Sequence, residues 1–244
     1  ETEMTSSVRL NKYLANQGIA SRRTIDKMIT AGRIKLNGHP VKLGDTLNPS
    51  KDEVTVDDQP ITNTQNNSAL EYYLINKPLG IISTTNDPHH RQTILSLVNS
   101  KTRLYPVGRL DKDSHGLILL TNDGLLTQQL THPSSHIPKT YRVVLAGQFT
   151  DAKLKKLQTG VKLKDGLSAP AQVNVLETRP RRTVINLTLI EGRNRQIRRM
   201  ATVLKLEVVD LKRISLGPIT LGDLKPGASR RLTPKELSSL TKLN

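Results

Sequence analysis

The sequence predicts an α+β protein in two parts: a small helix-helix-sheet unit, then a larger domain on a mixed, largely antiparallel sheet. Two short amphipathic helices precede a hairpin signal within residues 1–60. A polar segment with few large apolar residues, 61–70, then indicates a linker. Beyond it, in residues 71–244, several alternating strands have few helices between them, which favours an α+β over a doubly wound sheet.

The N-terminal unit, 1–60, shows helical spacing followed by strand alternation. One helical face ends at Gly18, and Ser21 can cap a second helix that ends at Gly32. Asn37-Gly38 is the strongest short hairpin signal. The apolar positions behind these predictions are Leu10, Tyr13 and Leu14 in the first helix, Ile25, Met28 and Ile29 in the second, and Ile34, Leu36, Val41, Val54 and Val56 in strands.

The larger domain, 71–244, opens with YYLINKPLGIIST, in which a Lys-Pro-Leu-Gly break separates two apolar runs. Further strand-like segments are GLILLT, YRVVLAG, AQVNVLE and TVINLTLI. Helical periodicity marks LLTQQLTH, DAKLKKLQTG and NRQIRRMATVLKL. The chain has no glycine-rich phosphate loop, so the sequence predicts no nucleotide cofactor.

The charge balance makes a polyanion, and above all a nucleic acid, the leading partner. The chain has 37 Lys and Arg against 21 Asp and Glu, a formal net charge of +16. With no Trp, one Phe and no apolar stretch near the roughly 18 residues of a spanning helix, a membrane partner is set aside. The absence of Cys excludes disulfides and thiolate zinc sites, and the first residues lack signal-peptide order, so we expect a cytoplasmic protein.

Basic residues concentrate in the N-terminal unit. Between residues 9 and 42, eight Lys or Arg face one acidic residue, Asp26. A basic helix is usually only a solvated face, but this ratio favours a phosphate-binding surface. The predicted RNA contacts of this unit are Arg9, Lys12, Arg22, Arg23, Lys27, Arg33 and Lys35.

The segment GRLDKDSHGLILLTNDG, residues 108–124, places two aspartates directly before an apolar run. Asp111 and Asp113 can form a side-chain-bonded turn, which is the commonest role of a loop aspartate. The spacing also resembles a calcium loop, but position 5 is His115, position 12 is Asn122 where a bidentate Glu is required, and the flanks are strand-like. In a third interpretation one of the two carboxylates is catalytic.

The string VGRLDKDSHGLILLTNDG resembles the signature of the RsuA/RluB-type pseudouridine synthases, and NKPLG, KTYRVVL and EGRNRQIRRM follow the same family order. This resemblance covers residues 71–237, and the N-terminal unit is similar to the alpha-L RNA-binding motif. It implies an enzyme that isomerises a uridine of ribosomal RNA to pseudouridine. It also implies a bifurcated antiparallel sheet with an RNA cleft, no cofactor and no metal, and we expect a monomer.

The resemblance also implies roles for individual residues. Asp111 is the essential carboxylate, as a nucleophile or as a base, and Arg198 is the neighbouring cation that favours its ionised form. Tyr141 stacks on the flipped uracil and assists proton removal from the base carbon. Without the motif, Tyr141 is more simply a sheet aromatic and Arg198 a solvated helix charge.

The arginine-rich segment from Arg179 to Met200 has seven arginines against one Glu, which indicates phosphate contacts along a cleft. Candidate RNA contacts are Arg193, Arg195 and Arg199 of this segment, together with Arg109 beside Asp111, whereas Asp113 is assigned to the turn. A rival hypothesis is a non-catalytic RNA-binding or ribosome-assembly protein. The C-terminal LGDLKPGASRRLTPKEL resembles the RluB branch, which favours the large-subunit 23S over the small-subunit 16S RNA as substrate.

Overall fold

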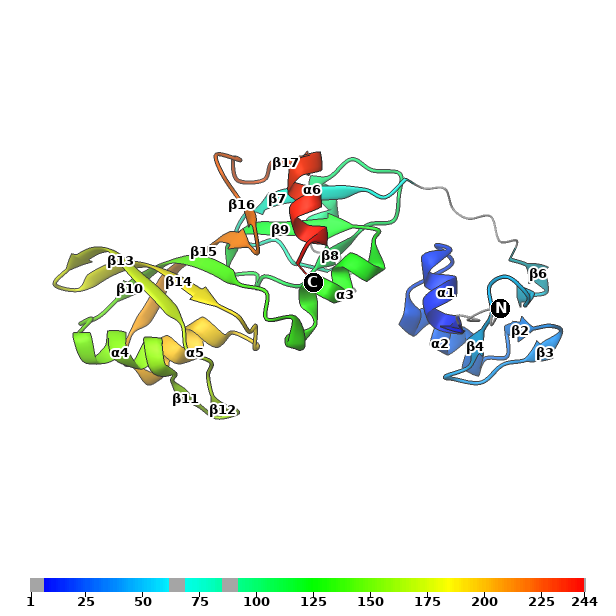
Figure 1. Ribbon diagram of the computed structural model, residues 1–244, viewed down its shortest axis with the longest axis horizontal. Coiled ribbons are helices and arrows are strands. Elements are labelled where there is room, and N and C mark those ends of the chain that lie inside the picture. The colour runs from blue at the N-terminus through cyan, green and yellow to red at the C-terminus, as the bar shows by residue number, and fades with distance from the viewer. Residues whose placement is uncertain (1–6, 62–68, 85–91, 244) are drawn as a thin grey trace. The chain divides into compact units, whose positions relative to one another are not determined.

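A computed structural model describes residues 7–61, 69–84 and 92–243 of the protein. The chain divides into two compact units, Glu1–Ala69 and Leu70–Asn244, called here the N-terminal and the C-terminal unit (Figure 1). Of the predicted linker, 61–70, residues 62–68 lie outside the described residues, as do residues 1–6 of the predicted first domain.

Both predicted helices of the N-terminal unit are confirmed. They are α1 (Leu10–Asn16) and α2 (Arg22–Thr30). The Ser21 hydroxyl accepts a hydrogen bond from the backbone N–H of Thr24 at 3.1 Å, so Ser21 is the N-cap of α2 as predicted. The strands are β1 (Val8–Arg9), β2 (Ile34–Leu36), β3 (His39–Pro40), β4 (Thr46–Leu47), β5 (Val54–Val56) and β6 (Gln59–Pro60).

The predicted hairpin turn joins β2 and β3. Asn37 and Gly38 have φ angles of 50° and 80°, the left-handed pair that a type I′ turn requires. Strand β2 also pairs with β5, and β1 pairs with β4. The apolar residues that predicted these elements meet in a core of this unit's own, which includes Leu10, Leu14, Ile25, Ile34 and Val54.

The C-terminal unit is built on a mixed, largely antiparallel sheet, as predicted. Among the described residues its central path runs β13-β14-β10-β15-β9-β7-β17, with β16 on β15 and β8 on β9. The strands are β7 (Tyr72–Lys77), β8 (Tyr105–Val107), β9 (His115–Thr121), β10 (Lys139–Ala146), β13 (Gln172–Arg179), β14 (Arg182–Leu189), β15 (Glu207–Leu216), β16 (Ile219–Thr220) and β17 (Ser229–Arg231), beside a separate hairpin of β11 (Lys162–Leu163) and β12 (Gly166–Leu167).

Four helices described in this unit cover the two halves of the sheet (Figure 1). In one core, α4 (Asp151–Thr159) and α5 (Gln196–Val203) pack on β10, β14 and β15. In another, α3 (Gly124–Thr131) and α6 (Pro234–Thr241) pack on β7 and β9. A third core includes residues of η1 (Ile94–Leu97) with the remaining side chains of β7 and β9, whereas η2 (Pro133–Ser135) is a short turn without buried residues.

The halves of the sheet meet at a short parallel contact between β9 and β15. Only two residue pairs form it in the described structure, Lys212 with His115 and Arg213 with Gly116. At Gly116, where φ is 102°, an added Cβ would lie 2.3 Å from the carbonyl oxygen of Arg213. Only glycine therefore fits where the two strands meet.

Several features differ from the sequence predictions. The helix predicted over residues 194–206 is shorter, because α5 ends at Val203 and the next residues lead into β15. Neither β15 nor α6 was predicted. The IIST run forms no strand, since Ile82 makes only an isolated bridge with Thr93.

Candidate active site

Asp111 lies in the loop between β8 and β9, and residues 80–83, at the end of the NKPLG motif and just after it, bind this loop. Ser83 Oγ donates to the carbonyl of Leu110 at 2.8 Å and accepts from its N–H at 3.1 Å. The N–H of Gly80 donates to the carbonyl of Lys112 at 2.9 Å. Within the loop, the N–H of Ser114 donates to the carbonyl of Asp111 at 3.0 Å. The backbone on both sides of Asp111 is therefore fixed.

The structure brings the three predicted catalytic residues to one cavity of about 610 Å³. Asp111 reaches it from the loop, Tyr141 from β10, and Arg198 from α5. Predicted RNA contacts Arg109, Arg193 and Arg195 line the same cavity. Tyr141 stands beside a register shift between Thr140 and Tyr141 and packs against two of the core clusters.

The pairing of arginines with aspartates differs from the expectation. Arg195 donates from Nη1 and Nη2 to the two carboxylate oxygens of Asp113 at 2.9 and 2.8 Å. Its Nη1 also lies 3.6 Å from an oxygen of Asp111. Arg198, expected beside Asp111, places Nε 3.2 Å from the Asp113 carboxylate and donates from Nη2 to the Asp113 carbonyl at 2.6 Å.

Two of these residues have contacts that the sequence did not predict, and their predicted roles stay predictions. Arg195, assigned to RNA phosphates, is the guanidinium that lies between both aspartates. Asp113, assigned to the turn, accepts from Arg195, and the hydrogen bond from that guanidinium lowers the pKa of its carboxyl. Arg195 is the N-cap residue of α5 and has a left-handed backbone conformation, with φ 47°. The partners are 82 residues apart in the chain, so sequence spacing alone carries no signal for this pair.

A buried lysine beneath the loop was not predicted from the sequence. Lys77, at the end of β7, is fully buried and donates from Nζ to the carbonyls of Ile81 and Pro78 at 2.8 and 3.1 Å. Burial lowers its pKa to about 8, although the charges of Asp111 and Asp113 act in the opposite direction. The signal that could have found it is a lysine that ends an otherwise apolar strand.

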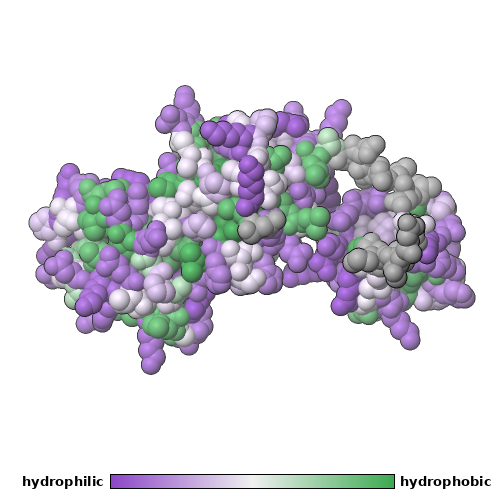
Figure 2. All heavy atoms as spheres, viewed as in Figure 1, coloured by the Kyte–Doolittle hydropathy of each residue, from purple (hydrophilic) through white to green (hydrophobic). Residues whose placement is uncertain are grey.

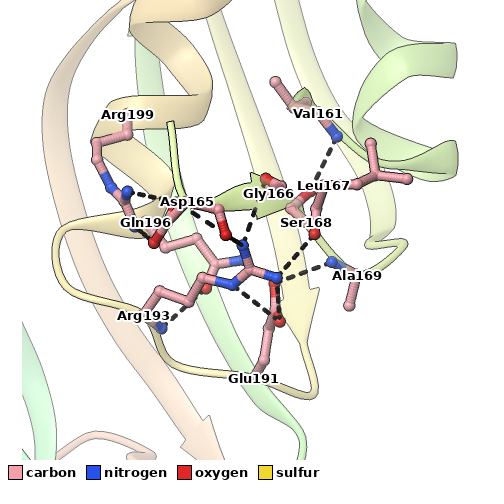
Figure 3. A network of polar contacts seen from close by, with 10 residues as sticks. All are labelled: Val161, Asp165, Gly166, Leu167, Ser168, Ala169, Glu191, Arg193, Gln196 and Arg199. Atoms are coloured by element: carbon pink, nitrogen blue, oxygen red, sulfur yellow. Dashed lines mark hydrogen bonds and ion pairs between the residues drawn. The ribbon is translucent and has the colours of Figure 1, made fainter. Parts of the chain in front are cut away.

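Arg193 and Arg199, two predicted RNA contacts, have internal partners (Figure 3). Arg193 donates from Nη2 to the carbonyl of Leu167 at 2.7 Å and from Nε to Glu191 at 3.3 Å. Arg199 forms a two-point contact with Asp165 at 2.8 and 3.1 Å. These contacts tie the β11–β12 hairpin to the loop before α5, so a phosphate would have to displace protein acceptors.

The predicted RNA contacts of the N-terminal unit fall into two groups. Arg33 pairs with Asp57 and Lys35 with Asp58, and Arg9 donates to the carbonyl of Gly44 at 3.0 Å. The remaining residues lie on the helices: Arg22, Arg23 and Lys27 are exposed on α2 and Lys12 is half-buried on α1. On the face seen in Figure 2, hydrophilic side chains predominate on this unit.

The described residues offer neither a metal site nor a membrane span. No three His, Asp or Glu side chains gather there as metal ligands would. Among the helices within residues 7–61, 69–84 and 92–243, none has both the length and the apolar composition needed to cross a membrane.

Comparison with known proteins identifies the family. The profile of RNA pseudouridylate synthase matches residues 71–202, which hold Asp111, Tyr141 and Arg198. The chain belongs to the RNA pseudouridine synthase family. The family and the enzyme class predicted from the sequence are therefore confirmed, and the S4 domain profile matches residues 8–54 of the synthase.

Relatives of this synthase cover nearly its whole length. Ribosomal large subunit pseudouridine synthase B of Bacillus subtilis is 38% identical, over 96% of each chain. The dual-specificity RNA pseudouridine synthase RluF of Escherichia coli is 38% identical over 98% of this chain and 80% of its own. A crystal structure of a pseudouridylate synthase matches with a TM-score of 0.69 and 32% identity, and covers 96% of this chain and 100% of its own.

Proposed function

We propose that this synthase isomerises one uridine of large-subunit ribosomal RNA to pseudouridine, with Asp111 as the essential carboxylate. The observation that carries the proposal is the convergence of Asp111, Tyr141 and Arg198 on one cavity, although they come from a loop, a strand and a helix. A flipped uridine that enters this cavity would meet the Asp111 carboxylate, and the hydrogen bonds on both sides of Asp111 hold that loop in place.

The reaction breaks the bond between ribose C1′ and uracil N1, turns the base, and rejoins it through C5. Asp111 either bonds to the sugar or takes a proton from it, and both roles need the ionised carboxylate. The guanidinium of Arg195 places a positive charge 3.6 Å from an oxygen of that carboxylate. Tyr141 offers a ring for stacking and a hydroxyl for removal of the C5 proton.

In this proposal Asp113 and Arg198 hold Arg195 and the loop of Asp111 in place and take no part in the chemical steps. The Asp113 carboxylate holds both guanidiniums, and Arg198 grips the loop through the carbonyl of Asp113. Arg198 also donates to the carbonyl of Val208 at 3.2 Å, which links the loop to β15. The network thus sets the distance between Arg195 and Asp111.

The choice of substrate rests on the relatives and on charge. A relative of similar length is named for the large ribosomal subunit, and exposed basic residues of α2 suit RNA phosphates. We assign RNA capture to residues 1–60, tethering to 61–70 and catalysis to 71–244. The synthase acts as a monomer in the cytoplasm, where its ribosomal substrate is made.

Pseudouridine mapping tests the proposal. Ribosomal RNA from cells with and without this gene is compared at single-nucleotide resolution. We expect one large-subunit uridine to stay unmodified in the deletion, and a plasmid copy to restore it while an Asp111→Asn copy does not. An unchanged map would refute the proposed function, and a loss confined to the small subunit would refute the choice of subunit.

A further inference from the structure

Two cations with no role in the mechanism above line the same cavity as Asp111 and Tyr141. Arg213 of β15 is only 3% exposed, and Lys139 at the start of β10 is half-buried. Burial, and after it the charge of Arg213, lowers the pKa of Lys139.

The fold holds Arg213 in place from both sides. Across the sheet, its backbone pairs with Tyr141 of β10 and with Gly116 of β9. The backbone of β9 at Gly116 lies so close to the backbone of Arg213 that a Cβ at position 116 would not fit. From the side chain, Nε donates to the carbonyl of Leu117 at 2.7 Å. The guanidinium is therefore preorganised.

One nitrogen of this guanidinium, Nη2, lacks an acceptor among the described residues, and it is buried. No carboxylate in the described part of the chain forms an ion pair with Arg213 or Lys139. A buried charged donor without a partner is costly, so a ligand that enters the cavity is expected to supply the acceptor.

The substrate brings suitable acceptors to this cavity. A uracil placed against Asp111 and Tyr141 carries two carbonyl oxygens, O2 and O4, into a space of about 610 Å³ that the two cations also line. When the bond between C1′ and N1 breaks, its electron pair stays on the ring and spreads over N1, O2 and O4. Fixed donors aimed at developing charge are worth most in a site without water.

We propose that Arg213, assisted by Lys139, donates hydrogen bonds to the carbonyl oxygens of the target uracil and stabilises the anion that this ring becomes on detachment. The inference rests on the proposed function. The charge is transient: the ring turns, C5 bonds to C1′, C5 loses its proton, and N1 ends protonated. Atoms and electrons therefore balance without any co-reactant.

Substitution of each cation separates this role from RNA binding. In the full chain, we expect Arg213→Gln to slow single-turnover conversion of a ribosomal RNA stem-loop by about 10²- to 10³-fold, the typical cost of losing one oxyanion donor. Lys139→Gln should have a smaller effect in the same direction. The dissociation constant for RNA should stay nearly unchanged, because the charge arises only after the bond breaks.

A modified substrate tests the charge directly. Fluorine at C5 withdraws electrons and stabilises the negative charge of the detached ring. Cleavage of the bond between C1′ and N1 should therefore depend less on Arg213. For each substrate we compare the rate of its consumption by the synthase of the original sequence with the rate for Arg213→Gln. The ratio of these rates should be severalfold smaller for RNA with 5-fluorouridine at the target position than for RNA with uridine. An equal loss for both substrates would overturn the proposal, because it would show a role in general positioning.

Other outcomes are also decisive. Weaker RNA binding with a shallower salt dependence would assign Arg213 to a phosphate and overturn the proposal, as would an unchanged rate. If Arg213→Gln lowers the melting temperature, the comparison is repeated with Arg213→Lys and Lys139→Gln.

Lys212→Gln is the matched control. Lys212 is the neighbour of Arg213 on the opposite face of β15, so this variant should keep full activity. Failure of the unmodified synthase on the stem-loop would instead count against the proposed function.

Discussion

The basic side chains of α2 in the N-terminal unit are exposed, whereas those of residues 193–199 in the C-terminal unit are engaged with acidic side chains and carbonyls. Both segments have a high density of positive charge in the sequence. Exposed cations attract a polyanion over a long range and are screened by salt. Paired guanidiniums instead fix loops and carboxylates. Basic residues are therefore exposed in one unit, where we propose that they capture RNA, and hold the candidate site together in the other.

The sharpest test of the C-terminal side of this comparison is Asp111→Asn, from which we expect no pseudouridine at all. Asparagine keeps the shape but loses the charge and the basicity that either role of Asp111 requires. Melting temperature and RNA affinity should remain close to those of the unmodified synthase. Asp151→Asn on the exposed face of α4 serves as the control and should be active. An active Asp111→Asn protein would show that this loop is not the catalytic centre.

Tyr141→Phe should have the next largest effect. The variant keeps the ring and removes the hydroxyl, so turnover should fall by about 10²- to 10⁴-fold, the range of general acid–base contributions. RNA affinity should persist, since stacking is retained. Single-turnover rates and binding isotherms check this expectation, and a fully active variant would show that only the ring matters.

Asp113→Asn tests the arginine network itself. An amide holds Arg195 and Arg198 less firmly, so we expect a loss of roughly 10- to 100-fold in turnover, as for a small misplacement of a catalytic group. The pH–rate profile should be lower at every pH, because the variant misplaces the catalytic carboxylate and leaves its chemistry unchanged. A pH–rate profile of Asp113→Asn identical to that of the original synthase would show that Asp113 only shapes the turn.

The double variant with Arg22→Gln and Arg23→Gln tests whether the exposed basic residues of α2 bind RNA. We expect weaker RNA binding and a log–log salt slope reduced by about 0.7 to 0.9 for each phosphate that the variant no longer neutralises. The rate at saturating RNA should be unchanged, because α2 only captures substrate. Binding that is insensitive to the change would show that the exposed basic face is merely solvated.

The smallest effect is expected away from RNA and substrate. Arg230 donates to both carboxylate oxygens of Glu236 at 2.8 and 2.7 Å, and this contact lowers the pKa of Glu236 to about 2. Since the folded-state pKa lies below the unfolded one, the stabilisation is complete above about pH 4.5 and disappears as the pH falls toward 2. Glu236→Gln should cost roughly 1 to 3 kcal/mol at pH 7 and little at pH 2. Urea unfolding at both pH values measures this difference.

Several elements were predictable because their causes are local. The Ser21 cap and the Asn37-Gly38 turn depend on neighbours within a few residues, and both are present. Strand β15 was missed because its alternation breaks at register shifts against β10 and because a buried position holds Arg213. Helix α6 follows a capping box at Thr233 that was present in the sequence but not recognised.

By itself, the sequence determined the α+β class, the basic N-terminal unit, and the loop that carries Asp111 and Asp113. These follow from periodicity, composition and a contiguous motif. Only the tertiary structure decided that Arg195 and Arg198 bind Asp113, that Arg193 holds a hairpin, and that Lys77 and Arg213 are buried. The physical reason is that a charged side chain takes its role from acceptors that packing brings within about 3 Å, and these partners lie far away in the chain.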